Sequence, residues 1–250
     1  MRFAKTLLFV CFLIWPNFSL MALATLPLLK SEDLEQCPIK VGEILTYNVK
    51  IAGLSAGKQV TQVVKETTLN GQQVYHLTSE SQTDSLFAKL YHFRDWKESY
   101  VTTSQLYPVR HVKSLEDRKY RAHVEIDFDG ENGIAQYSKN KNHKVIEVPI
   151  GIQDELSMVY FLRSKQLKVG QSYNFPILVK DRTREARLTI YRREMMKTEA
   201  LGRVETMALR TSHGYLIWLT NDNRRIPVRI EAETRIGKLI ATLERVDFVD

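Results

Sequence analysis

The sequence predicts a mainly β protein: a single curved antiparallel sheet of about a dozen strands that forms a barrel or half barrel, with one or two short helices at its mouth. Three observations predict this fold. In residues 119–128 every odd position is charged or His and every even position is apolar or Tyr, the period of a strand with one face in water. Dipeptides typical of tight turns, such as Asn70-Gly71 and Asp129-Gly130, join the strand-like segments. These segments also follow one another without intervening helices, as in an antiparallel meander.

The predicted strands are rich in Val, Ile, Thr and Tyr. In chain order they are residues 43–51, 57–68, 73–82, 94–103, 108–115, 119–128, 133–139, 172–180, 184–194, 203–211, 214–220, 224–233 and 237–248. Residues 138–144 (SKNKNHK), with three lysines, are predicted to form an exposed surface turn.

Two segments break the strand pattern and are predicted to be helical, residues 84–91 and residues 153–165. Asp154 is suited to cap the second helix, which has almost no polar side. A helix that is apolar all round must be covered on most sides. We therefore expect it across the open end of the sheet or inside its concavity.

The N-terminus has the pattern of a secretory signal peptide over residues 1–24, with Arg2 and Lys5 before an apolar run that ends in an A-x-A site. A retained membrane anchor is the alternative, although Pro16, Asn17 and Ser19 interrupt the run. Residues 25–38 are predicted to be an extended arm and residues 39–250 a single β domain. We expect the mature protein in the periplasm of a Gram-negative bacterium, not spanning a membrane.

Cysteine usage and charge limit the remaining classes of function. Cys37 would be the only cysteine left after cleavage, so no internal disulfide is expected, and its neighbours Glu35 and Gln36 do not fit a lipidation site. The formal net charge is +7. An exported basic chain meets anionic lipid heads, lipopolysaccharide or wall polymers and not nucleic acid, and a solvated basic face is the other explanation.

Residues 53–57 (GLSAG) match the G-x-S-x-G pattern of a nucleophile elbow, which would make Ser55 a catalytic serine. That motif requires a helix after the serine, whereas Lys58 to Thr68 read as a second strand. We therefore predict that Gly53 and Gly57 permit positive φ at a hairpin and that Ser55 is not catalytic.

The six His residues show no metal-binding spacing such as H-E-x-x-H, and Cys37 has no companion for a zinc site. No metal or cofactor is predicted. His76, His111 and His123 fall in predicted strands where they can converge, so a composite site stays open. An enzyme would need such a His beside a carboxylate or Ser inside a cleft.

Four blocks of the sequence, with a fifth segment after them, carry a family resemblance. They are VGEILTYNVKIAGLSAG at residues 41–57, FRDWKESY at 93–100, QDELSMVYFLR at 153–163 and WLTNDNRRIPVRI at 218–230, followed by RIGKLIATL. In these blocks the chain resembles the exported bacterial proteins grouped as domain of unknown function 3108, although it has Asp154-Glu155 where many members have Asp-Pro. The resemblance implies a β-rich exported protein with no established activity. At the level of fold it is similar to curved-sheet carriers that hold lipid or lipoprotein chains, which is an analogy.

The function expected from these features is non-catalytic binding of an amphipathic or lipid-like component of the cell envelope. The predicted binding residues are Tyr160, Phe161 and Trp218 for apolar contacts and Arg225 and Arg229 for an anionic head group. The alternative is a scaffold or assembly factor that binds another envelope protein through strand edges or loops, with no ligand in the barrel.

Overall fold

The computed structural model describes residues 39–212, 214–234 and 237–249. The described strands form one antiparallel sheet of 14 strands. Their order in the sheet is β8-β7-β6-β5-β4-β3-β2-β1-β14-β13-β12-β11-β10-β9. Strands that are consecutive in sequence pair with each other, except β8 and β9, which form the two edges of the sheet. Strand β1 pairs with β14, which joins two meanders into one sheet. The predicted signal peptide, arm and Cys37, and also His213, lie outside the described residues.

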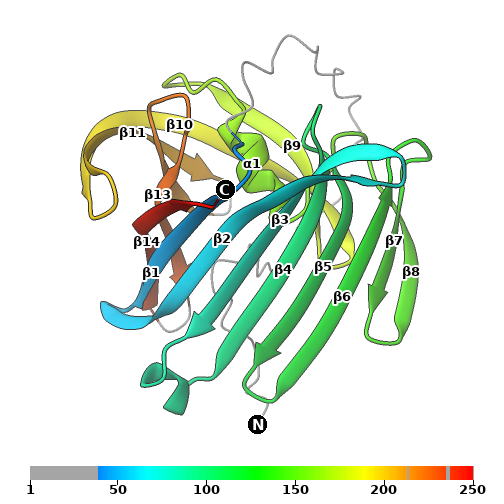
Figure 1. Cartoon of the computed structure of the whole chain (residues 1–250), viewed down its shortest axis with the longest axis horizontal. Coiled ribbons are helices and arrows are strands. Elements are labelled where there is room, and N and C mark those ends of the chain that lie inside the picture. The colour runs from blue at the N-terminus through cyan, green and yellow to red at the C-terminus, as the bar shows by residue number, and fades with distance from the viewer. Residues whose placement is uncertain (1–38, 213, 235–236, 250) are drawn as a thin grey trace.

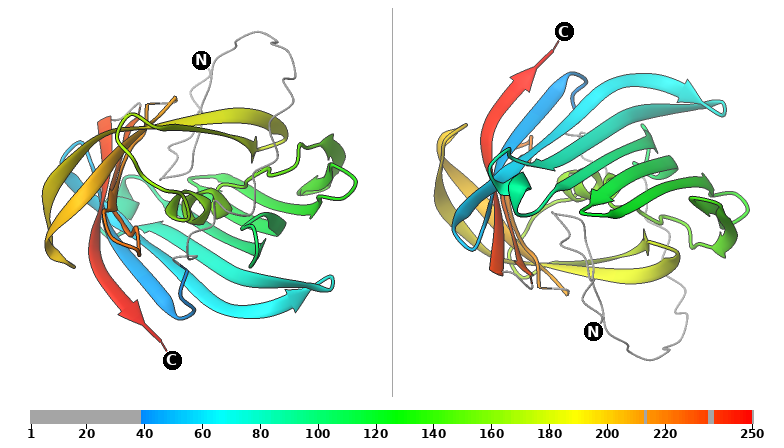
Figure 2. Two further views of the ribbon diagram at one scale, coloured as in Figure 1. Left: turned by 90° about the horizontal axis from the view of Figure 1, so that it is seen from above. Right: turned by 90° about the horizontal axis from the view of Figure 1, so that it is seen from below.

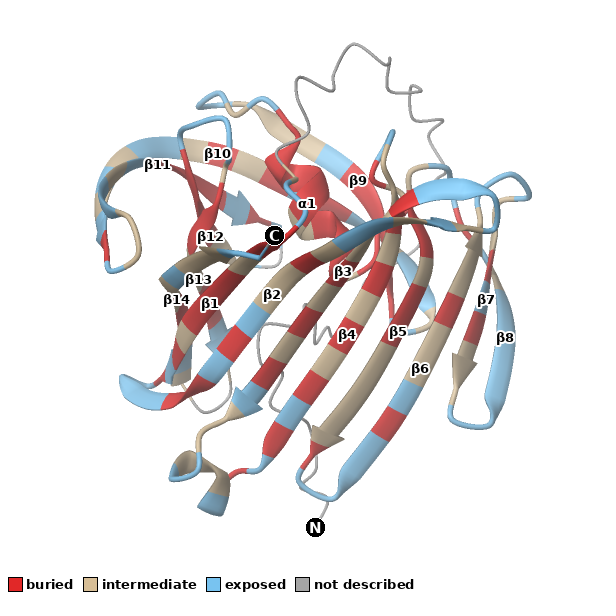
Figure 3. Cartoon of the chain, in the orientation of Figure 1, coloured by how far each residue is buried: buried red, intermediate tan, exposed pale blue. Residues whose placement is uncertain are grey.

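The strands alternate between buried and exposed positions along much of their length (Figure 3). Strands β1 to β14 comprise Glu43–Ile51, Leu54–Leu69, Gln72–Thr83, Phe93–Thr102, Pro108–Asp117, Tyr120–Asp129, Ile134–Lys139, Asn142–Glu147, Ser172–Val179, Arg182–Thr198, Gly202–Thr211, Leu216–Thr220, Pro227–Thr234 and Gly237–Phe248. The predicted fold class, a curved antiparallel β sheet with the shape of an open barrel, is confirmed.

The prediction of an exposed turn over residues 138–144 is wrong in part, because only Asn140 and Lys141 form a turn. Strand β8 begins at Asn142 and pairs with β7. This strand lies at the edge of the sheet, and most of its side chains are exposed. Side chains on both faces of β8 are exposed, so the alternation that identifies the other strands is missing here.

The sheet curls round a single α-helix, α1 (Ser157–Arg163), which lies inside its concavity (Figures 1 and 2). Residues 148–171 connect the two edge strands β8 and β9 and contain this helix. Gln153 forms a parallel bridge with Ile177 of β9, so the connection covers part of that open edge. The predicted helix at residues 84–91 is a single 3-10 turn, η2 (Phe87–Lys89), in the β3–β4 connection.

Two of the core clusters form where α1 meets the two halves of the sheet. Tyr160 packs on one half, with Val63, Leu77, Val101 and Leu106. Met158, Phe161 and Leu162 pack on the other half. Their neighbours there include Phe175, Ile177, Leu188, Ile190, Leu209, Ile217 and Leu219. The helix therefore fills most of the hollow that the curved sheet encloses.

The GLSAG segment is a hairpin, as predicted. Ala52 and Gly53 form the two-residue turn between β1 and β2, both with positive φ, and Ser55 is exposed on β2. Gly57 has a different role from the one predicted, because no positive φ occurs there. A Cβ atom on Gly57 would lie 2.0 Å from the carbonyl oxygen of Gln82 and 2.9 Å from the Cα atom of Thr83. Gly57 is needed for the close approach of β2 to β3.

Replacement of Gly57 by Ala is therefore expected to lower the free energy of unfolding by about 1–3 kcal/mol, because backbone atoms and not a flexible side chain must move. Gly130→Ala is the matched control, since its Cβ would meet nothing within 4 Å. Urea denaturation measures both variants. Equal stability of the two variants would contradict the steric argument.

Candidate binding cavity

The start of α1 is fixed by Asp154, as the sequence predicts. The Oδ1 atom of Asp154 accepts hydrogen bonds from the backbone N–H groups of Leu156 (2.7 Å) and Ser157 (2.8 Å). The hydroxyl of Ser157 accepts in return from the N–H of Asp154 at 2.9 Å. This reciprocal arrangement satisfies the free N–H groups at the start of the helix. The hydroxyl of Ser99 donates to the other carboxylate oxygen of Asp154, which ties the helix start to β4.

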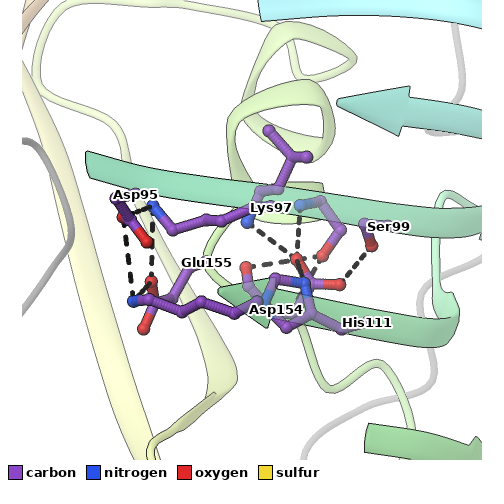
Figure 4. Close-up of polar contacts among 9 residues, drawn as sticks. Asp95, Lys97, Ser99, His111, Asp154 and Glu155 are labelled. Atoms are coloured by element: carbon purple, nitrogen blue, oxygen red, sulfur yellow. Dashed lines mark hydrogen bonds and ion pairs between the residues drawn. The ribbon is translucent and has the colours of Figure 1, made fainter. Parts of the chain in front are cut away.

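Charged side chains on the concave face of β4 and β5 meet the start of α1 (Figure 4). Lys97 Nζ lies 2.8 Å from Asp95 Oδ2 and 3.6 Å from Glu155 Oε2. Lys113 Nζ lies 2.7 Å from the same Glu155 oxygen, and His111 Nδ1 lies 3.5 Å from Asp154 Oδ1. We call this group the ionic cluster. It comprises Asp95, Lys97, His111, Lys113, Asp154 and Glu155.

Glu155 is ionised because of this cluster. Burial acts to raise its pKa, but the positive charges of Lys113 and then Lys97, with a hydrogen bond from Lys113 and a smaller effect of His111, lower the pKa to about 2. The carboxylate is therefore charged over the whole physiological range. The ionic cluster is a network of opposite charges and not a set of isolated buried charges.

The end of α1 is fixed by a second buried ion pair. The guanidinium of Arg163 donates to both carboxylate oxygens of Glu43 on β1, at 2.6 Å and 2.9 Å. The Arg163 side chain is fully buried and that of Glu43 is 3% exposed. Burial acts against the charge of Arg163, yet hydrogen bonding and attraction to Glu43 raise its pKa. Arg225 donates to the carbonyl oxygen of Arg163 at 3.0 Å, which adds a contact from the β12–β13 turn.

A cavity of about 50 Å³ lies between α1 and the concave face of the sheet. This volume is enough for a few water molecules. Its lining is mostly apolar. The apolar lining residues are Leu45, Leu156, Val159, Leu162, Ile217, Leu219, Pro227 and Ile230, with Tyr47 and Tyr160. The polar lining residues are Gln59, Thr61, Ser79, Lys97, Glu155 and Arg163.

Gln59 gives this cavity an unused hydrogen-bond acceptor. Its side-chain amide nitrogen donates to the hydroxyl of Ser79 at 3.3 Å. Its Oε1 atom has no hydrogen-bond partner among the described residues, although the residue is only 9% exposed. An acceptor buried without a partner is costly, and a donor that enters the cavity, water included, would remove this cost.

The structure brings two of the predicted binding residues into the hollow on α1. Tyr160 lines the cavity. Phe161 is buried against Phe175, with ring centroids 5.5 Å apart. Arg225 lies at the end of the same helix, through its bond to the carbonyl of Arg163.

Trp218 and Arg229 lie on the convex face of the sheet, away from these three. Ile217 and Leu219 line the cavity, and successive side chains of a strand point to opposite faces. Trp218 therefore points away from the cavity, and it is buried there: its indole N–H donates to Glu194 at 2.6 Å and the Arg229 guanidinium lies 5.7 Å from its ring centroid. Trp218 and Arg229 pair with each other across β12 and β13.

The ionic cluster and Gln59 were not among the predicted site residues. A signal for part of the cluster exists in FRDWKESY, because Asp95, Lys97 and Ser99 have the same parity as the buried Phe93 and Val101. Side chains of the same parity share one face of a strand. The parity places three polar side chains on the buried face but does not name their partners on α1.

Each of the three histidines considered in the sequence lies beside a carboxylate. His76 contacts Glu98 at 3.0 Å and His123 contacts Glu125 at 3.0 Å, while His111 faces Asp154. His123 also bonds the hydroxyl of Ser114, but these side chains are exposed on the convex face of β5 and β6. In the hollow, Ser99 bonds Asp154 and not His111. Ser99 therefore contacts a carboxylate and no imidazole, and because His111 lies beside that same carboxylate, the condition set from the sequence for an enzyme is met in part here.

Within the part of the chain that the structure describes, no group of three or more His, Cys, Asp or Glu side chains is placed to hold a metal ion. Over the same residues, no helix is long and apolar enough to cross a membrane.

Comparison with known protein families identifies the family of this chain. The profile of the family described as "Protein of unknown function (DUF3108)" matches residues 46–244. The chain belongs to the DUF3108 family. The DUF3108 match includes α1, the ionic cluster and every cavity-lining residue except Leu45. No curated protein sequence matches the chain.

Three solved structures are similar to this chain at low sequence identity. A β-barrel-like protein of domain of unknown function DUF1849 from Brucella abortus is similar with a TM-score of 0.57 and 12% identity, over 84% of this chain and 98% of that one. A candidate exported protein with YmcC-like fold from Bacteroides fragilis has 12% identity over 84% of this chain and 97% of that one, with a TM-score of 0.33. A candidate lipoprotein from Parabacteroides distasonis has 12% identity over 83% and 96% of the two chains, with a TM-score of 0.34. The first of these supports the barrel-like fold.

Proposed function

We propose that this protein is a non-catalytic periplasmic binding protein, which holds an amphipathic or lipid-like component of the cell envelope in the hollow of its sheet. The observation that carries the proposal is the lining of the cavity beside Tyr160. It combines aliphatic side chains with the buried, unpaired Oε1 atom of Gln59. Such a lining suits a guest with an apolar chain and a hydroxyl or amide donor.

The size of the cavity determines how a guest enters. About 50 Å³ is far less than an acyl chain needs. A lipid-like guest therefore requires α1 to shift, and its apolar chain then takes over contacts that Phe161 and Tyr160 now make with the sheet. Arg225, which contacts the end of α1, is the nearest of the predicted cations for an anionic head group. Trp218 and Arg229, on the convex face, have no part in this form of the proposal.

The proposal predicts that lipid co-purifies with the protein and is lost when the cavity is filled. Val159 lines the cavity and is only partly buried, so Val159→Phe places a ring in the space where a guest would lie. We expect at least a tenfold decrease in lipid per protein, measured by mass spectrometry of organic extracts. Val145→Phe is the control, because Val145 is 70% exposed on β8.

Thermal unfolding of both variants confirms that they are folded. A wild-type extract without lipid, together with no thermal shift on adding envelope lipids, would contradict the proposal.

A scaffold function remains the second candidate, and one observation favours it. Strand β8 is paired only on its β7 side within the sheet, and it has Val145 exposed. An open strand edge can bind a strand of another protein. Crosslinking in cells distinguishes the two functions. One specific protein adduct, found with protein that carries no lipid, would support the scaffold.

A further inference from the structure

One end of the sheet has three neighbouring strand connections. The strand order β6-β5-β4-β3-β2-β1 places the β1–β2, β3–β4 and β5–β6 connections side by side. In an antiparallel meander, alternate connections lie at the same end of the sheet. Figure 1 shows these three connections along its lower end, and Figure 2 shows the same end from below.

Large aliphatic side chains project into water from two of these connections. Leu54, next to the β1–β2 turn, is 67% exposed, and Leu86 and Leu90, on either side of η2, are 75% and 83% exposed. Single exposed apolar residues are ordinary. Three leucines on adjoining connections, with the exposed ring of Tyr120 on the next one, form an apolar patch at one end of the molecule.

Positive charges lie near these leucines and outnumber the acids of the same connections. Lys50, Lys89, Arg118 and Lys119 are exposed there. None of the four forms an ion pair with another described residue. Asp84 accepts a hydrogen bond from the N–H of Phe87, Asp117 from the hydroxyl of Tyr91, and Glu116 pairs with Arg121. We call this surface the hairpin rim. It consists of Lys50, Leu54, Leu86, Lys89, Leu90, Arg118, Lys119 and Tyr120.

The opposite end of the same strands differs in both respects. The β2–β3, β4–β5 and β6–β7 connections have no large hydrophobic side chain among the strongly exposed ones that the structure describes. The β6–β7 connection has Asp129 and Glu131. Hydrogen bonds from Asn132 lower the pKa of Asp129, so this carboxyl is ionised at neutral pH. Among the six connections from β1 to β7, large and strongly exposed aliphatic side chains therefore occur only at the hairpin-rim end, although Val41, Phe248 and Val249 are also exposed where β1 begins and β14 ends.

We infer that the hairpin rim docks on the surface of a bilayer that contains anionic phospholipids. Aliphatic side chains gain free energy by entering the boundary between head groups and acyl chains, while lysines and arginines a few ångströms away are attracted to the head-group charge. A soluble protein partner would have to supply an apolar groove and acidic side chains together. An anionic membrane supplies both features over its whole surface. This inference does not depend on a guest in the hollow.

Vesicle flotation tests the docking, with 7:3 phosphatidylethanolamine and phosphatidylglycerol compared with phosphatidylcholine alone. The triple variant K50Q/K89Q/K119Q is expected to lose about a hundredfold in partition to the anionic vesicles, or roughly fivefold for each lysine. The control K65Q/K168Q/K197Q removes the same charge from exposed lysines elsewhere and should bind like wild type. Residues 1–24 contain an apolar run, so all variants are compared with the same N-terminus. Wild-type binding should weaken as salt is added.

A second pair of triple variants tests whether the exposed leucines contribute to vesicle binding. L54S/L86S/L90S is expected to bind anionic vesicles more than a hundredfold more weakly, whereas V145S/V169S/M195S removes exposed apolar side chains away from the rim and should bind normally. Leu90→Trp should show a blue shift of its emission on addition of anionic vesicles, and Val169→Trp should not.

Equal binding of the rim and control variants, or binding to neither kind of vesicle, would overturn the inference, as would capture of another envelope protein by the rim without lipid. Lipid in the extracts together with no vesicle binding would leave the proposed function standing and remove the docking surface alone.

Discussion

Replacement of Glu43 by Gln is expected to lower the free energy of unfolding by about 3–5 kcal/mol, because it leaves the guanidinium of Arg163 charged and fully buried without its carboxylate. The guanidinium does not lose its proton, so it cannot relieve the strain by becoming neutral. Urea denaturation at neutral pH measures the loss. The exposed pair of Lys58 and Glu244 serves as the control, and Glu244→Gln should change stability by less than about 1 kcal/mol.

The reciprocal variant, Arg163→Met, tests the same pair from the other side. It leaves the Glu43 carboxylate buried without its cation, so it should lower the free energy of unfolding by about 3–5 kcal/mol, as Glu43→Gln does. The double variant should be more stable than the sum of the two single losses predicts, by about 0.5–3 kcal/mol. Additive losses would show that the pair contributes little to holding α1.

The strands could be predicted because their signal is local. Residues 119–128 alternate strictly, and the structure has β6 over Tyr120–Asp129, followed by the predicted turn. Helix α1 could also be predicted, since a segment as apolar as residues 156–162 must be covered and a curved sheet offers its concave face. The local pattern fails where a strand has no buried face, as in β8 with NHKVIE.

The faces of the C-terminal strands were harder to assign. Strand β12 reads LIWLT and is buried or half-buried at every position. Alternation cannot tell which side of such a strand faces the hollow. Trp218 was an attractive contact because of its size, yet the register places Ile217 and Leu219 inward and Trp218 outward beside Arg229. The pairing between strands, which the sequence does not reveal, decides the face.

Charged partners on separate elements also escape a reading of the sequence. Lys97 and Lys113 lie on β4 and β5, and their partner Glu155 is about 40 or more residues further along the chain. In the sequence Glu155 looked like a helix-start acid, and Asp154 alone takes that role. Only the position of α1 in the hollow brings the Glu155 carboxylate to the two lysines.

That contact makes the stability of the protein depend on Glu155 at low pH. The pKa of Glu155 is lowered from 4.5 to about 2 by the two lysines. A carboxyl group with a lowered pKa stabilises the folded state above its unfolded pKa, and this contribution is lost as the pH falls through the folded value. Wild type should therefore lose about 3 kcal/mol from this group between pH 4.5 and pH 2. Glu155→Gln lacks this step and should be about 3 kcal/mol less stable than wild type at pH 7.

The difference between the two stability curves isolates Glu155, because the other carboxyls with lowered pKa, such as Asp129 and Asp181, titrate in both proteins. Glu199→Gln, at an exposed position in the β10–β11 turn, should follow wild type at every pH. Urea denaturation from pH 7 to pH 2 should show the wild-type and Glu155→Gln curves converging in acid. A constant gap would mean that the lysines hold α1 no more firmly when Glu155 is charged. In that case the apolar contacts of Tyr160 and Phe161 would be left to keep the helix in the hollow.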